Sequence, residues 1–294
     1  DVGFPVPEGG AGALAMALRR RAEACGARVE CGVAATGIEI RSGRAGLVRL
    51  ADGRVLRARR AVLADVPAPA LYGGLVAAED LPPRLRHDVA RFDWDDATLK
   101  LNWALERPIP WLAPGARGAG TVHLGVDDDG LVDVAADLSV GRMPERPFIL
   151  LGQMTTADPT RSPEGTESAW AYTHLPRRHA ADESAVAALS ERVEQAVEGV
   201  APGFGDATIG RHVQTPLGLE HANRSLSLGA LNAGTAALHQ QLVLRPTRGL
   251  GRPETPIPGL YLAGASAHPG GGVHGACGWN AAVSALRQHG PRGV

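Results

Sequence analysis

The stretch Gly259–Gly275 reads GLYLAGASAHPGGGVHG. Its early part, Leu260–Ala263, is a short apolar run that is typical of a buried strand. Glycines follow at Gly264 and Gly270–Gly272, and the residues from Gly275 to Leu286 repeat apolar side chains at helical spacing. The stretch therefore predicts a strand, a glycine-rich loop and a helix, with the loop glycines facing a cleft.

The glycine run has a clear chemical use. Three successive glycines at Gly270–Gly272 let main-chain N–H groups come close to a flat or anionic ligand. A helix that begins near Gly275 adds partial positive charge. The spacing is formally G-x-G-x-x-G, yet no acidic residue stands about twenty positions further on in the sequence. We therefore expect the loop to bind one edge of some other ligand rather than to form a complete NAD site by itself. A purely structural glycine turn is the alternative.

A second glycine motif lies near the start of the chain. Gly10–Ala15 reads GAGALA, matches G-x-G-x-x-A, and has Glu30 about twenty residues later. A dinucleotide-binding turn needs an apolar strand directly before its first glycine, and the prolines of Phe4–Glu8 do not allow one. We interpret this motif as a glycine loop that enters a helix. An NAD-dependent dehydrogenase built on it is the less favoured alternative.

The rest of the chain divides into segments by the spacing of its apolar residues. Helical periodicity predicts helices at 12–25, 81–92 and 185–200. Apolar or alternating runs predict strands at 28–31, 37–41, 46–50, 55–58, 60–65, 98–105, 121–124, 148–155 and 168–174. Pro67 and Pro69 mark a boundary, after which strands follow long loops without crossover helices. The middle of the chain is therefore expected to form a mixed or antiparallel sheet.

Composition restricts the partners and the location. The 294 residues include 30 basic and 31 acidic side chains, so nothing favours nucleic acid as a partner. Three cysteines without a C-x-x-C pair favour a reducing compartment. The longest uncharged stretch, Gly259–Leu286, is broken by Pro269 and by glycines, which argues against a transmembrane segment. The expected location is the cytoplasm, with peripheral attachment to a membrane left open. Because the first residue is Asp, targeting is not readable.

The Gly259–Gly275 stretch resembles the C-terminal flavin motif of phytoene desaturase-like FAD-dependent oxidoreductases. Within them it is most similar to the pyridine nucleotide-disulfide oxidoreductase domain-containing branch. The similarity extends to further segments at both ends of the chain and is weak across 67–200; these segments are Pro7–Gly10, Val62–Asp65, Ala201–Phe204, Gln214–Pro216, Gln241–Pro246 and Thr255–Ile257.

The resemblance implies an α/β fold. It predicts an incomplete FAD/NAD(P)-binding three-layer domain with an inserted α+β substrate domain. The expected segments are 1–66 and 255–294 for the FAD-binding domain and 67–254 for the substrate domain. Such enzymes begin with a βαβ unit that carries the main ADP-binding glycines, and this unit is not visible in the sequence. The chain is therefore expected to be a C-terminal portion with a partial flavin site.

The resemblance also implies which residues contact FAD. The residue that matches Val273 offers its backbone N–H to the pyrimidine edge of the flavin. Gly264 and Ala265 lie beside the ribityl-phosphate portion, and the strand near 33–38 approaches the adenine end. The implied cofactor-binding residues are Gly9, Gly10, Ala35, Gly264, Ala265, Gly271, Gly272, Val273 and Gly275. No catalytic acid or base is identified.

Other patterns have ordinary interpretations. His268, His274 and Cys277 match no closed zinc motif, so no metal site is predicted. The acidic run Asp127–Asp129 lacks the glutamate of a calcium loop and is interpreted as a solvated turn. Four tryptophans could fill the core or line an apolar substrate cavity, with the core as the default; they are Trp94, Trp103, Trp111 and Trp170.

The expected function is hydride transfer from a substrate C–H bond to FAD, in a dehydrogenase or desaturase, with a small and apolar substrate. The alternative is a non-catalytic truncated or split subunit that needs a partner to bind FAD. That partner would be the missing N-terminal segment or a second chain that supplies it.

Overall fold

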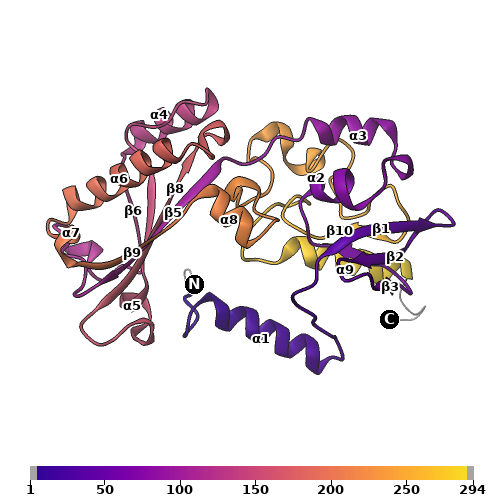
Figure 1. Cartoon of the computed structure of the whole chain (residues 1–294), viewed down its shortest axis with the longest axis horizontal. Helices are drawn as coiled ribbons and strands as arrows, with labels where there is room; N and C mark the ends of the chain where they lie inside the picture. The colour runs from indigo at the N-terminus through magenta and orange to yellow at the C-terminus, as the bar shows by residue number, and fades with distance from the viewer. Residues whose placement is uncertain (1–4, 290–294) are drawn as a thin grey trace. The chain divides into compact units, whose positions relative to one another are not determined.

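The computed structural model describes residues 5–289, which fall into two compact units. Unit 1 comprises the residues up to Val29 together with Asp96–Gly229. Unit 2 comprises Glu30–Asp95 together with the residues from Ala230 onward. Figure 1 shows the elements of both units along the chain. The α/β class predicted from the sequence is confirmed, because unit 1 contains an antiparallel sheet and unit 2 contains a parallel strand pair.

The units divide the chain at other places than the expected 66/67 and 254/255. Residues 68–92 belong to unit 2 because their apolar side chains, such as Leu71 and Phe92, share a buried core with Leu260 and Leu262. The first residues belong to unit 1, where the Gly9 amide donates a hydrogen bond of 2.7 Å to Asp158 Oδ2.

Unit 1 is built on a five-stranded antiparallel sheet in the order β6-β7-β8-β5-β9. Its strands are β5 (Ala97–Leu105), β6 (Thr121–Leu124), β7 (Ile149–Gln153), β8 (Glu167–Leu175) and β9 (Thr208–Gln214). Its helices are α1 (Ala11–Ala24), α4 (Asp128–Ser139), α5 (Met154–Ala157), α6 (Glu183–Val200), α7 (Phe204–Ala207) and α8 (Pro216–Ala222). The expected antiparallel sheet in the middle of the chain is therefore present.

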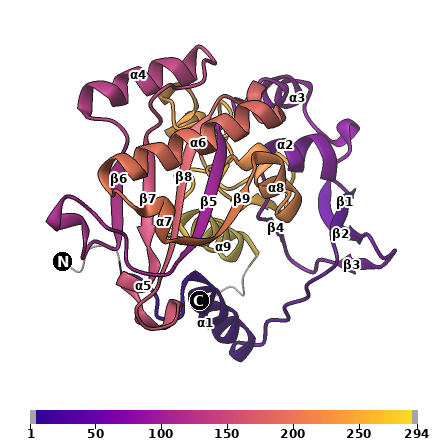
Figure 2. The ribbon, with the colours of Figure 1, turned by 60° about the vertical axis from the view of Figure 1, so that its left-hand side comes forward.

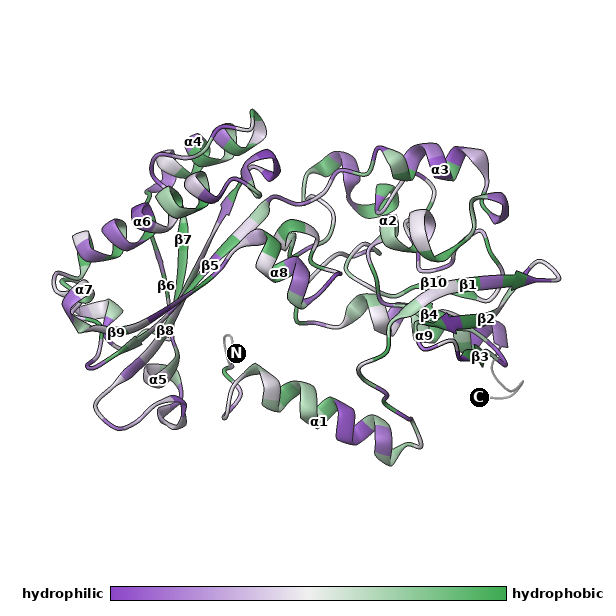
Figure 3. Cartoon of the chain, viewed as in Figure 1, coloured by the Kyte–Doolittle hydropathy of each residue, from purple (hydrophilic) through white to green (hydrophobic). Residues whose placement is uncertain are grey.

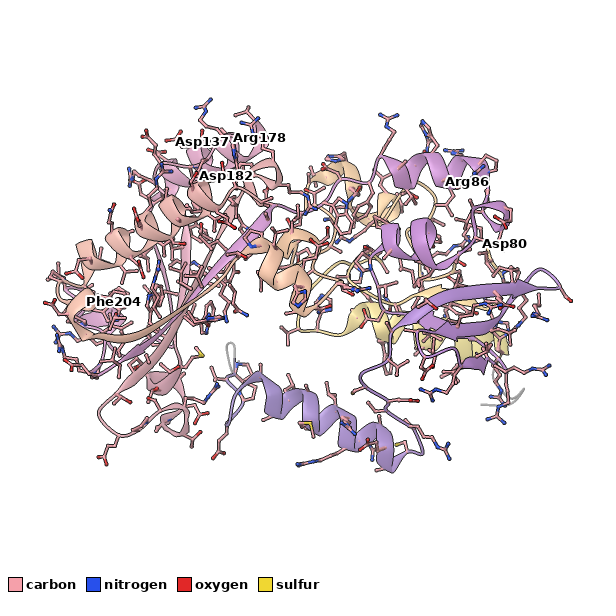
Figure 4. All side chains as sticks on the ribbon, viewed as in Figure 1. Asp80, Arg86, Asp137, Arg178, Asp182 and Phe204 are labelled. Carbon is pink, nitrogen blue, oxygen red and sulfur yellow. The ribbon has the colours of Figure 1, made fainter. Side chains whose placement is uncertain are left out.

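One face of this sheet is covered by α6, which crosses it in Figure 2. Alternation along the strands explains the packing, because Leu99, Leu101 and Trp103 of β5 are buried with Leu189 and Val193 of α6. Trp103 also packs edge-to-face on Phe204, which is labelled in Figure 4, with ring centroids 5.2 Å apart.

Helix α6 begins where the sequence provides a cap. The Asp182 side chain, also labelled in Figure 4, accepts hydrogen bonds from the Ser184 and Ala185 amides at 3.1 Å. The start of α4 is formed in the same way, since Asp127 Oδ1 accepts from the Gly130 amide at 3.0 Å. The acidic run Asp127–Asp129 is exposed to solvent as expected, but it caps and opens a helix where a turn was expected.

Unit 2 combines two small sheets with helices. Its antiparallel sheet has the order β1-β2-β3, and its parallel pair joins β10 to β4. The strands are β1 (Ala35–Arg41), β2 (Arg44–Leu50), β3 (Val55–Arg57), β4 (Val62–Ala64) and β10 (Leu260–Leu262). The helices include α2 (Ala68–Ala70), α3 (Pro83–Ala90) and α9 (Ala276–His289), and a π-helical turn spans Leu71–Leu75. The strand expected at 28–31 does not form.

The parallel pair places the C-terminal motif in the fold. Leu260 pairs with Val62 and Leu262 with Ala64, although almost two hundred residues separate the strands in sequence. Helix α9 packs on β10 through Tyr261, Ala281 and Ala285. The prediction that these two strands belong to one structural unit is confirmed.

Apolar side chains are also exposed. Figure 3 shows hydrophobic residues along α1, where Leu14, Met16 and Leu18 are exposed. Within residues 5–289, every helix is too short or too polar to cross a membrane.

Candidate functional site

The glycine-rich loop between β10 and α9 lines a cleft of about 380 Å³ in unit 2. The strand, loop and helix form as the sequence predicted, and the loop glycines face this cleft. The lining residues come from the position after β4, the loop, the start of α9 and one distant segment; they are Asp65, Leu231, Ala263–Ala265, Gly270–Gly272 and His274–Gly278.

Two of these glycines are needed because the backbone is approached closely. A Cβ on Gly264 would lie 2.7 Å from Asp65 Oδ1, and a Cβ on Gly271 would lie 2.6 Å from Asn232 Oδ1. Both distances are far shorter than a carbon–oxygen contact allows. The glycines therefore shape the wall of the cleft as well as leaving its amides accessible.

The cleft lies at the carboxyl ends of two parallel strands. Asp65 directly follows β4, and Ala263 directly follows β10. Open α/β sheets bind ligands at this edge, because loops diverge there and helix N-termini point at it. Asp65 was not among the residues predicted to bind the cofactor. The signal that could have found it is a polar residue directly after an apolar strand.

The N-terminus of α9 contributes partial positive charge to the cleft. Cys277 and Gly278 of its first turn line the cleft, and His274 Nδ1 accepts a hydrogen bond of 2.9 Å from the Ala276 amide. A helix N-terminus stabilises negative charge placed before it. The arrangement can therefore hold an anionic or electron-rich group against main-chain N–H donors.

Five of the nine predicted cofactor-binding residues line this cleft: Gly264, Ala265, Gly271, Gly272 and Gly275. Val273 belongs to the same loop but is 93% exposed and does not line the cleft. Ala35 is exposed at the start of β1. Gly9 and Gly10 belong to unit 1, where Gly10 packs against the Arg161 side chain.

Two of the three side chains considered as zinc ligands, Cys277 and His274, make hydrogen bonds within the loop. Cys277 Sγ donates to the carbonyl oxygens of Gly270 at 3.1 Å and Ala267 at 3.4 Å, and thereby closes the loop onto α9. His274 caps the helix. Across the described part of the chain, no three His, Cys, Asp or Glu side chains form a group that could hold a metal ion.

Unit 1 has a second candidate surface, on the sheet face opposite α6. Register places Lys100 beside Tyr172 and Asn102 beside Trp170 on this face. The Trp170 and Tyr172 rings stack with centroids 5.9 Å apart and an interplanar angle of 9°. Gly152 faces Trp170 from β7, where a Cβ would lie 2.5 Å from the indole. The glycine thus lets the indole lie close against β7.

Lys100 gives this face its charge. Its Nζ donates to Asn102 Oδ1 at 2.8 Å and lies 5.9 Å from the centroid of Trp170. Burial lowers the pKa of Lys100, because the ammonium form loses hydration. This half-buried lysine was missed from the sequence. The signal was its place in alternation with Leu99 and Leu101, which puts it on the opposite face.

The tryptophans divide between core and surface. Trp103 and Trp111 are buried in the core of unit 1, as the default interpretation expected. Trp94 packs against the core of unit 2. Trp170 is half-buried on the open face of the sheet.

Comparison with known proteins identifies the family. The sequence profile described as "Flavin containing amine oxidoreductase" matches residues 2–285. Pyridine nucleotide-disulfide oxidoreductase domain-containing protein 2 of Rattus norvegicus is 32% identical over 95% of this chain and 50% of its own length. The neurosporene-forming phytoene desaturase of Cereibacter sphaeroides is 26% identical over 97% of this chain and 54% of its own length. The chain thus spans about half the length of the curated relatives it matches.

Solved structures show the same fold. An oxidoreductase from Methanosarcina mazei superposes with a TM-score of 0.64 at 17% identity, over 96% of this chain and 55% of its own. Putrescine oxidase bound to putrescine superposes with a TM-score of 0.62 at 14% identity, over 96% of this chain and 53% of its own. The profile match covers almost all of the sequence, and the chain therefore belongs to the family of flavin-containing amine oxidoreductases.

Proposed function

We propose that this chain is part of an FAD-dependent oxidoreductase of the dehydrogenase or desaturase type. The observation that carries the proposal is the cleft at the carboxyl ends of β4 and β10, which is formed by glycine backbone and the N-terminus of α9. FAD, when bound, would supply hydride acceptance from a substrate C–H bond. Family membership supports a flavin, and the relatives' names include a desaturase.

The residues of unit 2 would bind and orient this cofactor. Gly264 and Gly271 would let the loop backbone pack closely against Asp65 and Asn232, because a Cβ at either position would collide with those residues. The first turn of α9 would stabilise negative charge on the reduced flavin ring. The oxidised flavin would thereby become a better oxidant. By the resemblance, the Val273 amide would face the pyrimidine edge, and Gly9, Gly10 and Ala35 would lie near other parts of FAD.

We propose that unit 1 binds the substrate. Its open sheet face presents the stacked rings of Trp170 and Tyr172 beside Leu150, which suits a small apolar or unsaturated molecule. Carotenoid-like, lipid-like and amine substrates all remain candidates. The balanced charge of the chain and its three free cysteines support a cytoplasmic protein that does not act on nucleic acid.

A non-catalytic subunit that needs a partner to bind FAD is the second candidate. It is favoured by the two-stranded extent of the β10-β4 sheet and by Leu63 of β4, which is 42% exposed where a buried strand was expected. The partner would supply a βαβ segment, in the same chain or in another, whose glycine turn binds the pyrophosphate. Each charge-assisted hydrogen bond that it adds is worth roughly 1.5–3 kcal/mol.

Titration of FAD into the purified 294-residue chain, followed by flavin fluorescence and visible absorbance, tests both candidates. We expect weak or no binding by this chain and tight binding once a βαβ segment is added, in cis or in trans. Submicromolar binding by these residues alone would show that no partner segment is needed. Absence of binding in both forms would overturn the flavin proposal. Anaerobic bleaching of the bound flavin by carotenoid, lipid or amine candidates would then identify the substrate class.

A further inference from the structure

Arg245 is the largest fully buried side chain of the described residues, with 1% of its surface exposed. Its guanidinium donates hydrogen bonds to main-chain carbonyl oxygens. Nη1 donates to Thr235 at 2.9 Å, and Nη2 donates to Asn232 at 2.7 Å and to Ala265 at 2.8 Å. Nε also donates to Ala265, at 3.2 Å. All these residues belong to unit 2.

These bonds join two segments that form the wall of the cleft. Ala265 lies in the glycine loop and lines the cleft. Asn232 follows the lining residue Leu231, and its side chain packs against Gly271. A Cβ on Gly270 would lie 3.3 Å from Arg245 Nε, so the guanidinium lies directly behind the loop. Arg245 thus holds the loop against residues 231–235 from the buried side.

The chemistry of the guanidinium suits this role. Arginine carries five N–H donors in a rigid plane and stays protonated in proteins. Burial lowers the pKa of Arg245, while Cys277 and Asp95 nearby act in the opposite direction. A buried charge is tolerated only when its donors are satisfied, so the carbonyl oxygens around it must keep their places. A lysine could keep the charge but not the planar set of bonds.

We infer that Arg245 is a positioning residue that sets the shape of the cofactor cleft by holding the Ala265 and Gly270–Gly271 backbone from behind. The inference rests on the proposed function only for the identity of the ligand. The shape of the loop is a property of the chain itself and can be measured without FAD.

Hydrogen exchange of the amides of 264–275 tests the inference in the purified chain without added cofactor. Arg245→Met removes the charge and all donors, and Arg245→Lys keeps the charge. Arg248→Met is the control, because Arg248 is exposed three residues away. We expect exchange in the loop to rise about tenfold or more in Arg245→Met, less in Arg245→Lys, and not in the control. Strands β1 and β2 should keep their protection in all three.

Affinity for FAD gives the second measurement, made in whichever form of the protein binds it. We expect Arg245→Met to weaken FAD binding about tenfold and Arg245→Lys to restore part of the loss, with a changed flavin absorption spectrum in the methionine variant. Unchanged loop exchange, or equal loss of protection across all of unit 2, would overturn the inference. If Arg245→Met does not fold, Arg245→Lys decides by the same criteria. If the wild type binds no FAD either with or without the added βαβ segment, the proposed function fails, and the exchange experiment still decides the role of Arg245.

Discussion

Single residues in this protein are constrained by backbone proximity as much as by side-chain chemistry. Gly264 and Gly271 are required because Asp65 and Asn232 occupy the space that a Cβ would fill. Glycine content alone would not distinguish them from Gly74, which has open space around it. Their role is therefore visible only from what lies opposite them in the fold.

Gly271→Ala is expected to lower the free energy of unfolding by about 1–3 kcal/mol, because its Cβ would lie 2.6 Å from Asn232 Oδ1 and 3.2 Å from Asn232 Cα. Urea denaturation of unit 2 measures the change. Gly74→Ala is the matched control and should be close to neutral. Equal stability of the two variants would contradict the steric argument.

Lys100 predicts a specific pH dependence. Its folded-state pKa is lowered by burial, so between that pKa and the ordinary value the unfolded chain binds a proton that the folded chain does not. Stability therefore rises with pH across this window. We expect the wild type to gain stability relative to Lys100→Met between neutral pH and about pH 10. Urea denaturation at several pH values measures the difference in stability between the two proteins. A difference that stays constant with pH would contradict the lowered pKa of Lys100.

For some secondary-structure elements, the periodicity of apolar residues was sufficient to predict the element from the sequence. The helix predicted at 185–200 is α6, Glu183–Val200, and the strand predicted at 98–105 is β5, Ala97–Leu105. Both have strong apolar patterns that face one core. Helix α4 was missed because its acidic start looked like a turn, whereas Asp127 caps it. Strand β9 was missed because it is an edge strand with no buried residue and therefore carries little apolar pattern.

The interior strand β5, which pairs with β8 and β9, should carry much of the stability of unit 1. Leu101 has no exposed surface and is packed within the core under α6. We expect Leu101→Ala to lower the free energy of unfolding by about 2–5 kcal/mol, because it leaves a cavity. Ile209→Ala, in the edge strand β9 where the side chain is 68% exposed, should cost roughly 0.5 kcal/mol or less. Urea denaturation measures the free energy of unfolding of both variants. Similar losses of stability in both would contradict the burial of Leu101 in the core of unit 1.

At the scale of the whole molecule, the units are defined by contacts between distant segments. Residues 68–92 were expected in the substrate domain, because prolines at 67 and 69 looked like a boundary. Their apolar side chains instead share a core with Ile257 and Leu260 of unit 2. A proline pair marks a break in secondary structure, but only packing decides which core a segment joins.

The sequence by itself determined the strand, glycine loop and helix around Gly270–Gly272, the α/β class and the family resemblance. These depend on the spacing of neighbouring residues and on the backbone freedom of glycine, and both can be recognised directly in the sequence. Only the tertiary structure brought Asp65 and Leu231 to the cleft, placed Arg245 against its loop, and assigned Gly9 and Gly10 to the other unit. The physical reason is that burial and close approach depend on which distant segments pack together, and a polar side chain such as Arg245 carries no local sign that it will be enclosed.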